Sequence, residues 1–180
     1  MSTPKMDGAQ ALIKTLADLG IEYVFGYSGG AAIPIFDALQ TVKTDMKFIL
    51  VRHEQGAVHM ADGYARATGK PAVVLVTSGP GAGNTVTGIM TAQMDSVPMI
   101  ILCGQQVTWM LGKDAFQEAD IFNITSPVVK HNFLVKSSNA LPRIAREAYH
   151  IATTGRPGPV LIDIPKDISQ GPFTGTFDEP

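Results

Sequence analysis

Cysteine and clustered charge are both scarce in this chain of 180 residues, and each scarcity excludes a class of protein. The single cysteine, Cys103, excludes an internal disulfide and any metal site built from several thiolates. The 14 basic residues form no stripe against the 16 acidic ones, which argues against a nucleic-acid partner. The apolar runs are strand-length, and residues 1–10 lack the pattern of a secretory leader. We therefore expect a cytoplasmic domain with no membrane partner.

Strand-like apolar runs alternate with helical segments along the chain. This alternation predicts an α/β fold: a doubly wound, mostly parallel sheet of about six strands with helices on both faces. Ligands of such sheets bind at the carboxyl ends of the strands. The expected strands are 22–25, 47–51, 72–77, 99–103, 128–133 and 159–164. The expected helices are 9–17, 32–40, 54–68, one from the turn at 78–81 to about 94, and 141–153.

Two stretches show no helical or strand-like periodicity. Residues 104–120 form a long irregular segment, and loops of that length are usually functional or disordered. The tail from residue 169 to 180 holds glycine, proline and threonine, as a linker does. We therefore expect one domain over residues 1–168 and the start of an interdomain linker or tail over 169–180.

Glu54 stands between an expected apolar strand and a helix rich in small residues. The helix continues through Ala57 and Ala61, and small side chains let another backbone or a flat ring approach closely. A carboxyl group held there would be poorly hydrated, and desolvation favours its protonated form. The helix N-terminus opposes this by stabilising the anion by up to ~2 kcal/mol. We interpret Glu54 as a candidate acid that exchanges one proton in a dry pocket.

A glycine-rich turn follows the third expected strand, with the sequence Ser78-Gly79-Pro80-Gly81-Ala82-Gly83-Asn84. The dinucleotide fingerprint needs glycine where Asn84 stands, and the Gly-Lys-Ser/Thr of a phosphate loop is absent. The exposed main chain here could face a flat heterocycle, or it could be a tight structural turn.

Two further motifs have known enzymatic counterparts but fit them poorly. Gly26-Tyr27-Ser28-Gly29-Gly30 matches a hydrolase nucleophile elbow, yet only one strand precedes Ser28, where that fold has several. His53 and Glu54 begin a zinc motif whose second histidine position is occupied by Ala57. We expect neither a hydrolase nor a zinc site.

Several short motifs occur in one order along nearly the whole chain. They are Phe25-Gly26-Tyr27-Ser28-Gly29-Gly30, Arg52-His53-Glu54-Gln55-Gly56-Ala57, Met60-Ala61-Asp62-Gly63-Tyr64-Ala65-Arg66, Thr77-Ser78-Gly79-Pro80-Gly81, Asp95-Ser96-Val97-Pro98, Asp114-Ala115-Phe116-Gln117-Glu118, Lys130-His131-Asn132-Phe133, and Gly155-Arg156-Pro157-Gly158-Pro159 through Asp163-Ile164-Pro165-Lys166-Asp167. In this order they resemble the catalytic subunit of acetolactate synthase (acetohydroxyacid synthase), a thiamine-diphosphate enzyme. The resemblance is to the synthases rather than to the related decarboxylases.

The resemblance implies the N-terminal, pyrimidine-binding (PYR) domain of such an enzyme. Glu54 would hydrogen-bond a ring nitrogen of the cofactor aminopyrimidine and control its proton. The enzyme would decarboxylate pyruvate and ligate the two-carbon unit to a second 2-oxo acid, a step of branched-chain amino acid biosynthesis. The resemblance also implies cofactor contacts at Gly29, Gly30, Pro80, Gly81 and Asn84. It implies that Phe116 and Gln117 line the substrate side, with Gln117 acting in catalysis. Lys166 would lie at the mouth of the substrate channel, and Arg156 would contact FAD if this member binds FAD.

The chain departs from the family pattern in two places. Ser28 stands where relatives usually have proline, and Gln106-Val107-Thr108-Trp109 replaces the usual Gln-Val-Pro. The first departure alters the rigidity of a turn, and the second bears on substrate choice.

Relatives bind the diphosphate and Mg²⁺ through a Gly-Asp-Gly motif on a separate domain, and this chain contains no Gly-Asp-Gly. We therefore expect a partner domain in the same or another chain, a homo-oligomer, and no activity from this chain alone. The chain would be a fragment of a longer polypeptide or one half of a split enzyme. The alternatives are the smaller subunit of a split sulfopyruvate- or phosphonopyruvate-type decarboxylase and a non-catalytic assembly domain.

Overall fold

The computed structural model describes residues 6–177, in which six strands form one parallel sheet. Their order across the sheet is β2-β1-β3-β4-β6-β5. This arrangement confirms the predicted α/β architecture. The strands are β1 Tyr23–Gly26, β2 Lys47–Leu50, β3 Ala72–Val76, β4 Met99–Gln105, β5 His131–Leu134 and β6 Pro159–Pro165.

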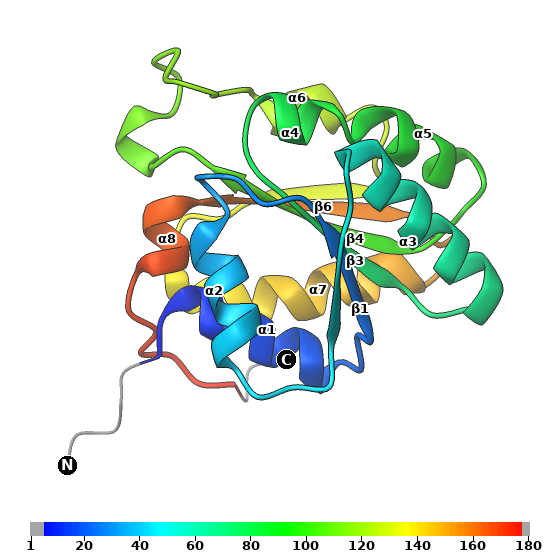
Figure 1. The fold of residues 1–180 in the computed structure, drawn as a ribbon, viewed down its shortest axis with the longest axis horizontal. Helices are drawn as coiled ribbons and strands as arrows, with labels where there is room; N and C mark the ends of the chain where they lie inside the picture. The colour runs from blue at the N-terminus through cyan, green and yellow to red at the C-terminus, as the bar shows by residue number, and fades with distance from the viewer. Residues whose placement is uncertain (1–5, 178–180) are drawn as a thin grey trace.

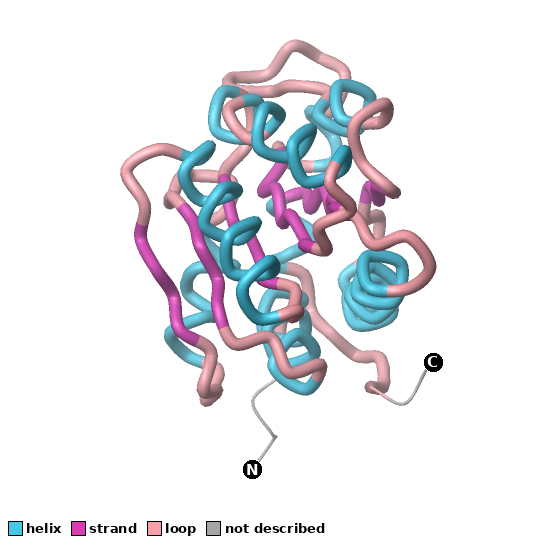
Figure 2. The backbone as a smooth tube through the Cα atoms, turned by 90° about the vertical axis from the view of Figure 1, so that its right-hand side faces the viewer, coloured by secondary structure: helices cyan, strands magenta, loops and turns pink. Residues whose placement is uncertain are grey.

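Helices cover both faces of the sheet (Figure 1). One face carries α1 Gly8–Asp18, α2 Ile33–Thr41, α7 Leu141–Thr153 and α8 Lys166–Gln170. The other carries α3 Glu54–Thr68, α4 Pro80–Gly83, α5 Val86–Met94 and α6 Ile121–Thr125. Two short 3-10 turns, η1 Thr108–Met110 and η2 Ser138–Ala140, lie in the connecting loops. Figure 2 shows the strands running between these helices from a perpendicular direction.

Strand alternation divides the apolar interior into two cores. In β3, Val73 and Leu75 pack with α1, α2 and α7, whereas Val74 and Val76 pack with α3 and α5. Both β3 and β4 are buried along their whole length, as strands of a parallel sheet covered on both sides are. The same alternation directs the side chains of Gln105 and Asp163 toward the face that carries α3 to α6.

The structure corrects the expected elements in the middle of the chain. The helix expected up to Met94 is two short helices, because Thr85 N–H and its hydroxyl both turn back to the carbonyl of Ala82. The strand expected at 128–133 begins only at His131, since the N–H groups of Val128 and Val129 donate to Thr125 and close α6.

The chain continues to pack on the domain beyond residue 168. Helix α8 ends at Gln170, Phe173 is buried, and Asn139 accepts hydrogen bonds from the N–H groups of Thr174 and Gly175. The division at 168/169 stays a prediction, and residues 178–180 of the expected tail lie outside the described residues. Over residues 6–177, no helix has both the length and the apolarity needed to cross a membrane.

Candidate functional site

The strand order creates a switch point between β1 and β3. The chain passes from β1 outward to β2 and then returns to β3 on the other side of β1. The turns that follow β1 and β3 therefore diverge at the carboxyl edge of the sheet, where ligands of such folds bind. Glu54 begins α3 immediately after β2 at the same edge.

Glu54 is sequestered at this edge, with a relative exposure of 9%. Its Oε2 accepts a hydrogen bond of 2.9 Å from Asn84 Nδ2. Its Oε1 lies beside Gly81, where an added Cβ would approach that oxygen to 3.2 Å. His53 caps α3 instead of Glu54, because its Nδ1 accepts from the Gln55 N–H at 3.2 Å. The Asn84 hydrogen bond thus occupies Oε2, and Oε1 lies beside Gly81.

The turn after β1 packs against Thr77, the residue that follows β3. A Cβ on Gly29 would lie 2.5 Å from Thr77 Cγ2, so no larger residue fits there. Thr77 Oγ1 also accepts a hydrogen bond of 3.3 Å from the Ala31 N–H. By contrast, a Cβ on Gly30 would meet no heavy atom within 4 Å. Gly29 therefore joins the two turns, and Gly30 borders open space.

The first two residues of the long segment expected over 104–120 belong to β4, and the loop that remains, 106–120, meets the glycine-rich turn through Gln117. Gly79 has a φ of +60°, and a Cβ there would lie 2.4 Å from the Gln117 carbonyl oxygen. Gln117 itself has a φ of 57°, a conformation that costs a non-glycine residue about 1–3 kcal/mol. The adjacent Phe116 is 82% exposed. The structure therefore brings the main chain of Gln117 against Gly79, the residue before Pro80.

Glu118 fixes the shape of this loop. Its carboxylate accepts hydrogen bonds from the Ala115 N–H, at 2.8 Å, and from the Gly112 N–H. These backbone donors, Ala115 first, lower the pKa of Glu118. Gln106 Nε2 adds a hydrogen bond of 2.6 Å to the Phe116 carbonyl. The exposed Phe116 is thus presented by an internally bonded loop.

Lys166 and Arg156 lie apart from each other. Lys166 begins α8 directly after β6, at the carboxyl edge of the sheet. Arg156 precedes β6 at the amino edge and donates to Ser96 Oγ at 2.8 Å and to the Met94 carbonyl at 3.0 Å. The structure therefore places Lys166 on the same edge as Glu54, and Arg156 on the opposite edge.

Comparison with protein families decides which group the chain belongs to. Residues 6–124 match the family described as the thiamine pyrophosphate (TPP) enzyme, N-terminal TPP binding domain. The chain is a member of this family.

Relatives of this TPP-binding domain include acetolactate synthase large subunits. The large subunit of Haemophilus influenzae is 54% identical over 98% of the chain and 30% of that protein. The isozyme 3 large subunit of Escherichia coli is 56% identical, over 91% of the chain and 28% of that protein. The large subunit of Lactococcus lactis is 53% identical, over 90% and 28%. The chain thus spans less than a third of the length of these relatives.

The alternative motifs in this TPP-binding domain do not assemble into sites. Ser28 follows the carboxyl end of β1, whereas His131 starts β5 and His150 lies in the last turn of α7. No hydrolase triad is therefore formed by these residues. His59 approaches Gln55 Nε2 at 3.4 Å and is exposed. Within residues 6–177, no three His, Cys, Asp or Glu side chains gather as metal ligands.

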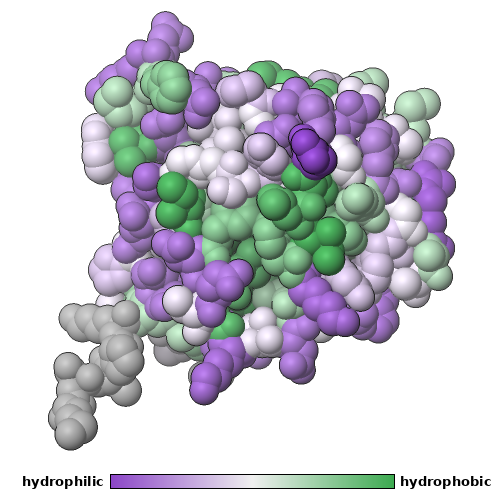
Figure 3. Space-filling model, in the orientation of Figure 1, coloured by the Kyte–Doolittle hydropathy of each residue, from purple (hydrophilic) through white to green (hydrophobic). Residues whose placement is uncertain are grey.

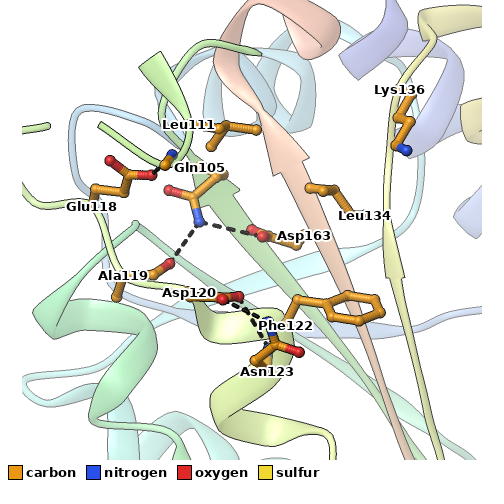
Figure 4. Close-up of a pocket in the computed structure, with 11 residues that line it drawn as sticks. Gln105, Leu111, Glu118, Ala119, Asp120, Phe122, Asn123, Leu134, Lys136 and Asp163 are labelled. Atoms are coloured by element: carbon orange, nitrogen blue, oxygen red, sulfur yellow. Dashed lines mark hydrogen bonds between the residues drawn. The ribbon is translucent and has the colours of Figure 1, made fainter. Parts of the chain in front are cut away.

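Sequence reasoning missed a buried polar pair that joins β4 and β6 (Figure 4). Gln105 Nε2 donates to Asp163 Oδ2 at 3.2 Å and to the Ala119 carbonyl at 2.9 Å. Burial raises the pKa of Asp163 to about 7, which the Gln105 hydrogen bond opposes and the charge of Asp120 reinforces. The available signal was one acidic residue within the apolar run 159–164.

Proposed function

We propose that the chain is the PYR domain of a thiamine-diphosphate-dependent enzyme of the acetolactate synthase type. The complete enzyme would decarboxylate pyruvate and join the two-carbon unit to a second 2-oxo acid. The observation that carries the proposal is the sequestered Glu54, held by Asn84 on one oxygen and presenting the other beside Gly81.

The residues around Glu54 fit a flat aminopyrimidine. A side chain at Gly81 would crowd Glu54 Oε1, and Gly30 borders open space. Ser78 is 1% exposed, and its hydroxyl has no hydrogen-bond partner in the described part of the chain. Buried hydroxyls are rarely left without a partner, so a polar ligand atom would satisfy it. The open space beside Gly30 and the unpartnered Ser78 hydroxyl are the features that support a bound ligand here.

Each residue of the site then has a defined task. Glu54 Oε1 exchanges a proton with a ring nitrogen, and Asn84 fixes the carboxylate for that exchange. Thiamine diphosphate, when bound, supplies the electron sink for decarboxylation. Gly29, Gly30, Pro80 and Gly81 would border the pyrimidine ring. Phe116 and Gln117 would line the substrate side, and Lys166 would lie at the mouth of the substrate channel.

Two cofactor contacts belong to the complete enzyme. The diphosphate and its Mg²⁺ need oxygen ligands, and we assign them to a second domain because this chain has no Gly-Asp-Gly. We also keep FAD as a candidate at Arg156. That guanidinium lies at the amino edge of the sheet, so a flavin there would meet the domain far from Glu54.

An exposed apolar surface beside the site supports a partner domain. Figure 3 shows apolar side chains gathered near the middle of the face seen in Figure 1. Edge strand β2 and the start of α2 contribute Ile49, Leu50 and Ile33, and Leu50 is 64% exposed. Apolar surface of this kind marks an interaction site. A second domain seated here would cover the strand that leads into Glu54.

A chimera tests the proposal. This chain would replace the matching N-terminal part of the Escherichia coli isozyme 3 large subunit, to which it is 56% identical. We expect the purified chimera to form acetolactate from pyruvate. An aldehyde product would favour the split-decarboxylase alternative. A folded chimera without turnover would favour the non-catalytic assembly domain and contradict the proposal.

A further inference from the structure

A cavity of about 630 Å³ opens at the carboxyl ends of β4, β6 and β5 (Figure 4). None of its lining residues belongs to the group around Glu54. The two sites also occupy different halves of the sheet, because Glu54 follows β2 and Pro80 follows β3. The cavity therefore needs an explanation of its own.

The floor of this cavity holds a carboxylate oxygen that lacks a hydrogen bond. Asp163 is 3% exposed, and its Oδ2 accepts from Gln105 Nε2. Its Oδ1 is buried and has no partner among the described residues. A buried acceptor left unsatisfied costs about 1–3 kcal/mol, and more when it is charged. Asp163 lines the cavity, so a donor bound in the cavity lies beside this carboxyl group.

Gln105 cannot supply the missing donor. Its Nε2 already donates to Asp163 Oδ2 and to the Ala119 carbonyl, and its Oε1 accepts from the Gln106 N–H at 2.8 Å. An amide nitrogen has two hydrogens, so both are in use. The donor for Asp163 Oδ1 must therefore come from outside this hydrogen-bonded group.

The charges around the cavity favour a cationic donor. Three acidic side chains, Glu118, Asp120 and Asp163, line it against one basic side chain, Lys136. Backbone donors lower the pKa of Glu118 and keep it anionic, and Asp120 accepts from the N–H and the amide of Asn123. Both of these carboxylates are committed to local hydrogen bonds, so Asp163 is the one with a free oxygen. The other walls include Leu111, Phe122 and Leu134.

We propose that this cavity binds a small organic cation, an alkylammonium or alkylguanidinium, whose N–H group donates to Asp163 Oδ1. The carbon chain of the ligand lies against the apolar wall formed by Leu111, Phe122 and Leu134. The ligand and Asp163 have opposite charges and share a hydrogen bond. Because the floor of the cavity is desolvated, this contact is stronger than the same contact in water. This site is independent of the assignment of the Glu54 site.

Titration of the full chain with propylguanidinium tests the proposal, followed by the amide NMR signals of the lining residues. Near pH 8 the Asp163 carboxyl, whose pKa burial raises to about 7, is ionised. We expect saturable shifts at Leu111 and Leu134, and at least about tenfold weaker binding in Asp163→Asn. Asp37→Asn removes the same charge from the exposed side of α2 and should bind as the wild type does.

A second variant keeps the test decisive if Asp163→Asn fails to fold. Lys136 is exposed, so Lys136→Gln should fold normally, and it should bind the cation about twofold to fivefold more tightly because a like charge is removed. Absence of saturation, equal binding by Asp163→Asn, or equally tight binding of butyrate would overturn the proposal. Sedimentation should stay unchanged during the titration. A shift to smaller species would assign the cavity to a basic side chain of a second copy and overturn the free-ligand site.

Discussion

At the scale of single residues, Glu54 and Asp163 are two buried carboxyl groups at the same edge of the sheet, and their surroundings differ. Glu54 has an amide donor on one oxygen and has Gly81 beside the other. Asp163 lies deeper, and burial raises its pKa to about 7. A carboxyl whose pKa is raised by folding binds more protons in the native state than in the unfolded chain. Asp163 therefore makes stability fall as pH rises.

The Asp163→Asn variant should remove this component of the pH dependence. The loss of stability caused by Asp163 develops as pH rises from the ordinary pKa of 3.8 to about 7, and it is complete above that pH. Between about pH 5 and pH 8, the wild type should lose roughly 3 kcal/mol more unfolding free energy than the variant. Guanidinium chloride unfolding at the two pH values measures the difference. Parallel losses in the two proteins would show that Asp163 stays ionised throughout.

Elements with strong local signals could be predicted from the sequence. Helices α3 and α7 have the bounds expected from apolar periodicity, and Gly69, with a φ of +74°, ends α3 as expected. Helix α6 was missed because its 5 residues are too few to show a period. The Gln105–Asp163 pair was missed because its members are 58 positions apart, and only the sheet register brings them together.

The sequence predicted which residues lie around Glu54, but not how they contact one another. The motifs named Glu54, Gly81 and Asn84, but the choice of Asn84 as the donor to Glu54 depends on the break between α4 and α5. The role of Thr77 in joining two turns had no sequence signal beyond its place at the end of a strand.

The contact between the glycine-rich turn and the long loop can be tested by Gly79→Ala. A Cβ there would lie 2.4 Å from the Gln117 carbonyl oxygen and adopt a φ of +60°. We expect a loss of unfolding free energy of about 2–4 kcal/mol, from backbone strain and loop displacement together. Gly20→Ala is the matched control, since Gly20 has a φ of +79° in open space and should cost only about 1 kcal/mol. Equal losses would show that the clash is relieved without cost.

Exposed methionines indicate a further contact surface at the scale of the whole molecule. Met60 on α3 and Met90 and Met94 on α5 are 48%, 44% and 75% exposed, on helices that pack together. We predict that the isolated chain self-associates through these helices. Sedimentation velocity should show that Met94→Glu shifts the population toward monomer, whereas Met110→Glu, on η1, leaves it unchanged. A wild-type chain that is monomeric at all concentrations would contradict this.

The central claim is that one proton on Glu54 activates the cofactor of a complete enzyme. The most direct test is Glu54→Gln in the chimera with the Escherichia coli relative, with Glu147→Gln on the exposed side of α7 as the control. Gln keeps the size of the side chain and can still face Asn84, but it cannot exchange a proton. We predict that acetolactate formation falls by about 10²- to 10⁴-fold, with folding and the control unaffected. Turnover within about twofold of the unmodified chimera would contradict the account.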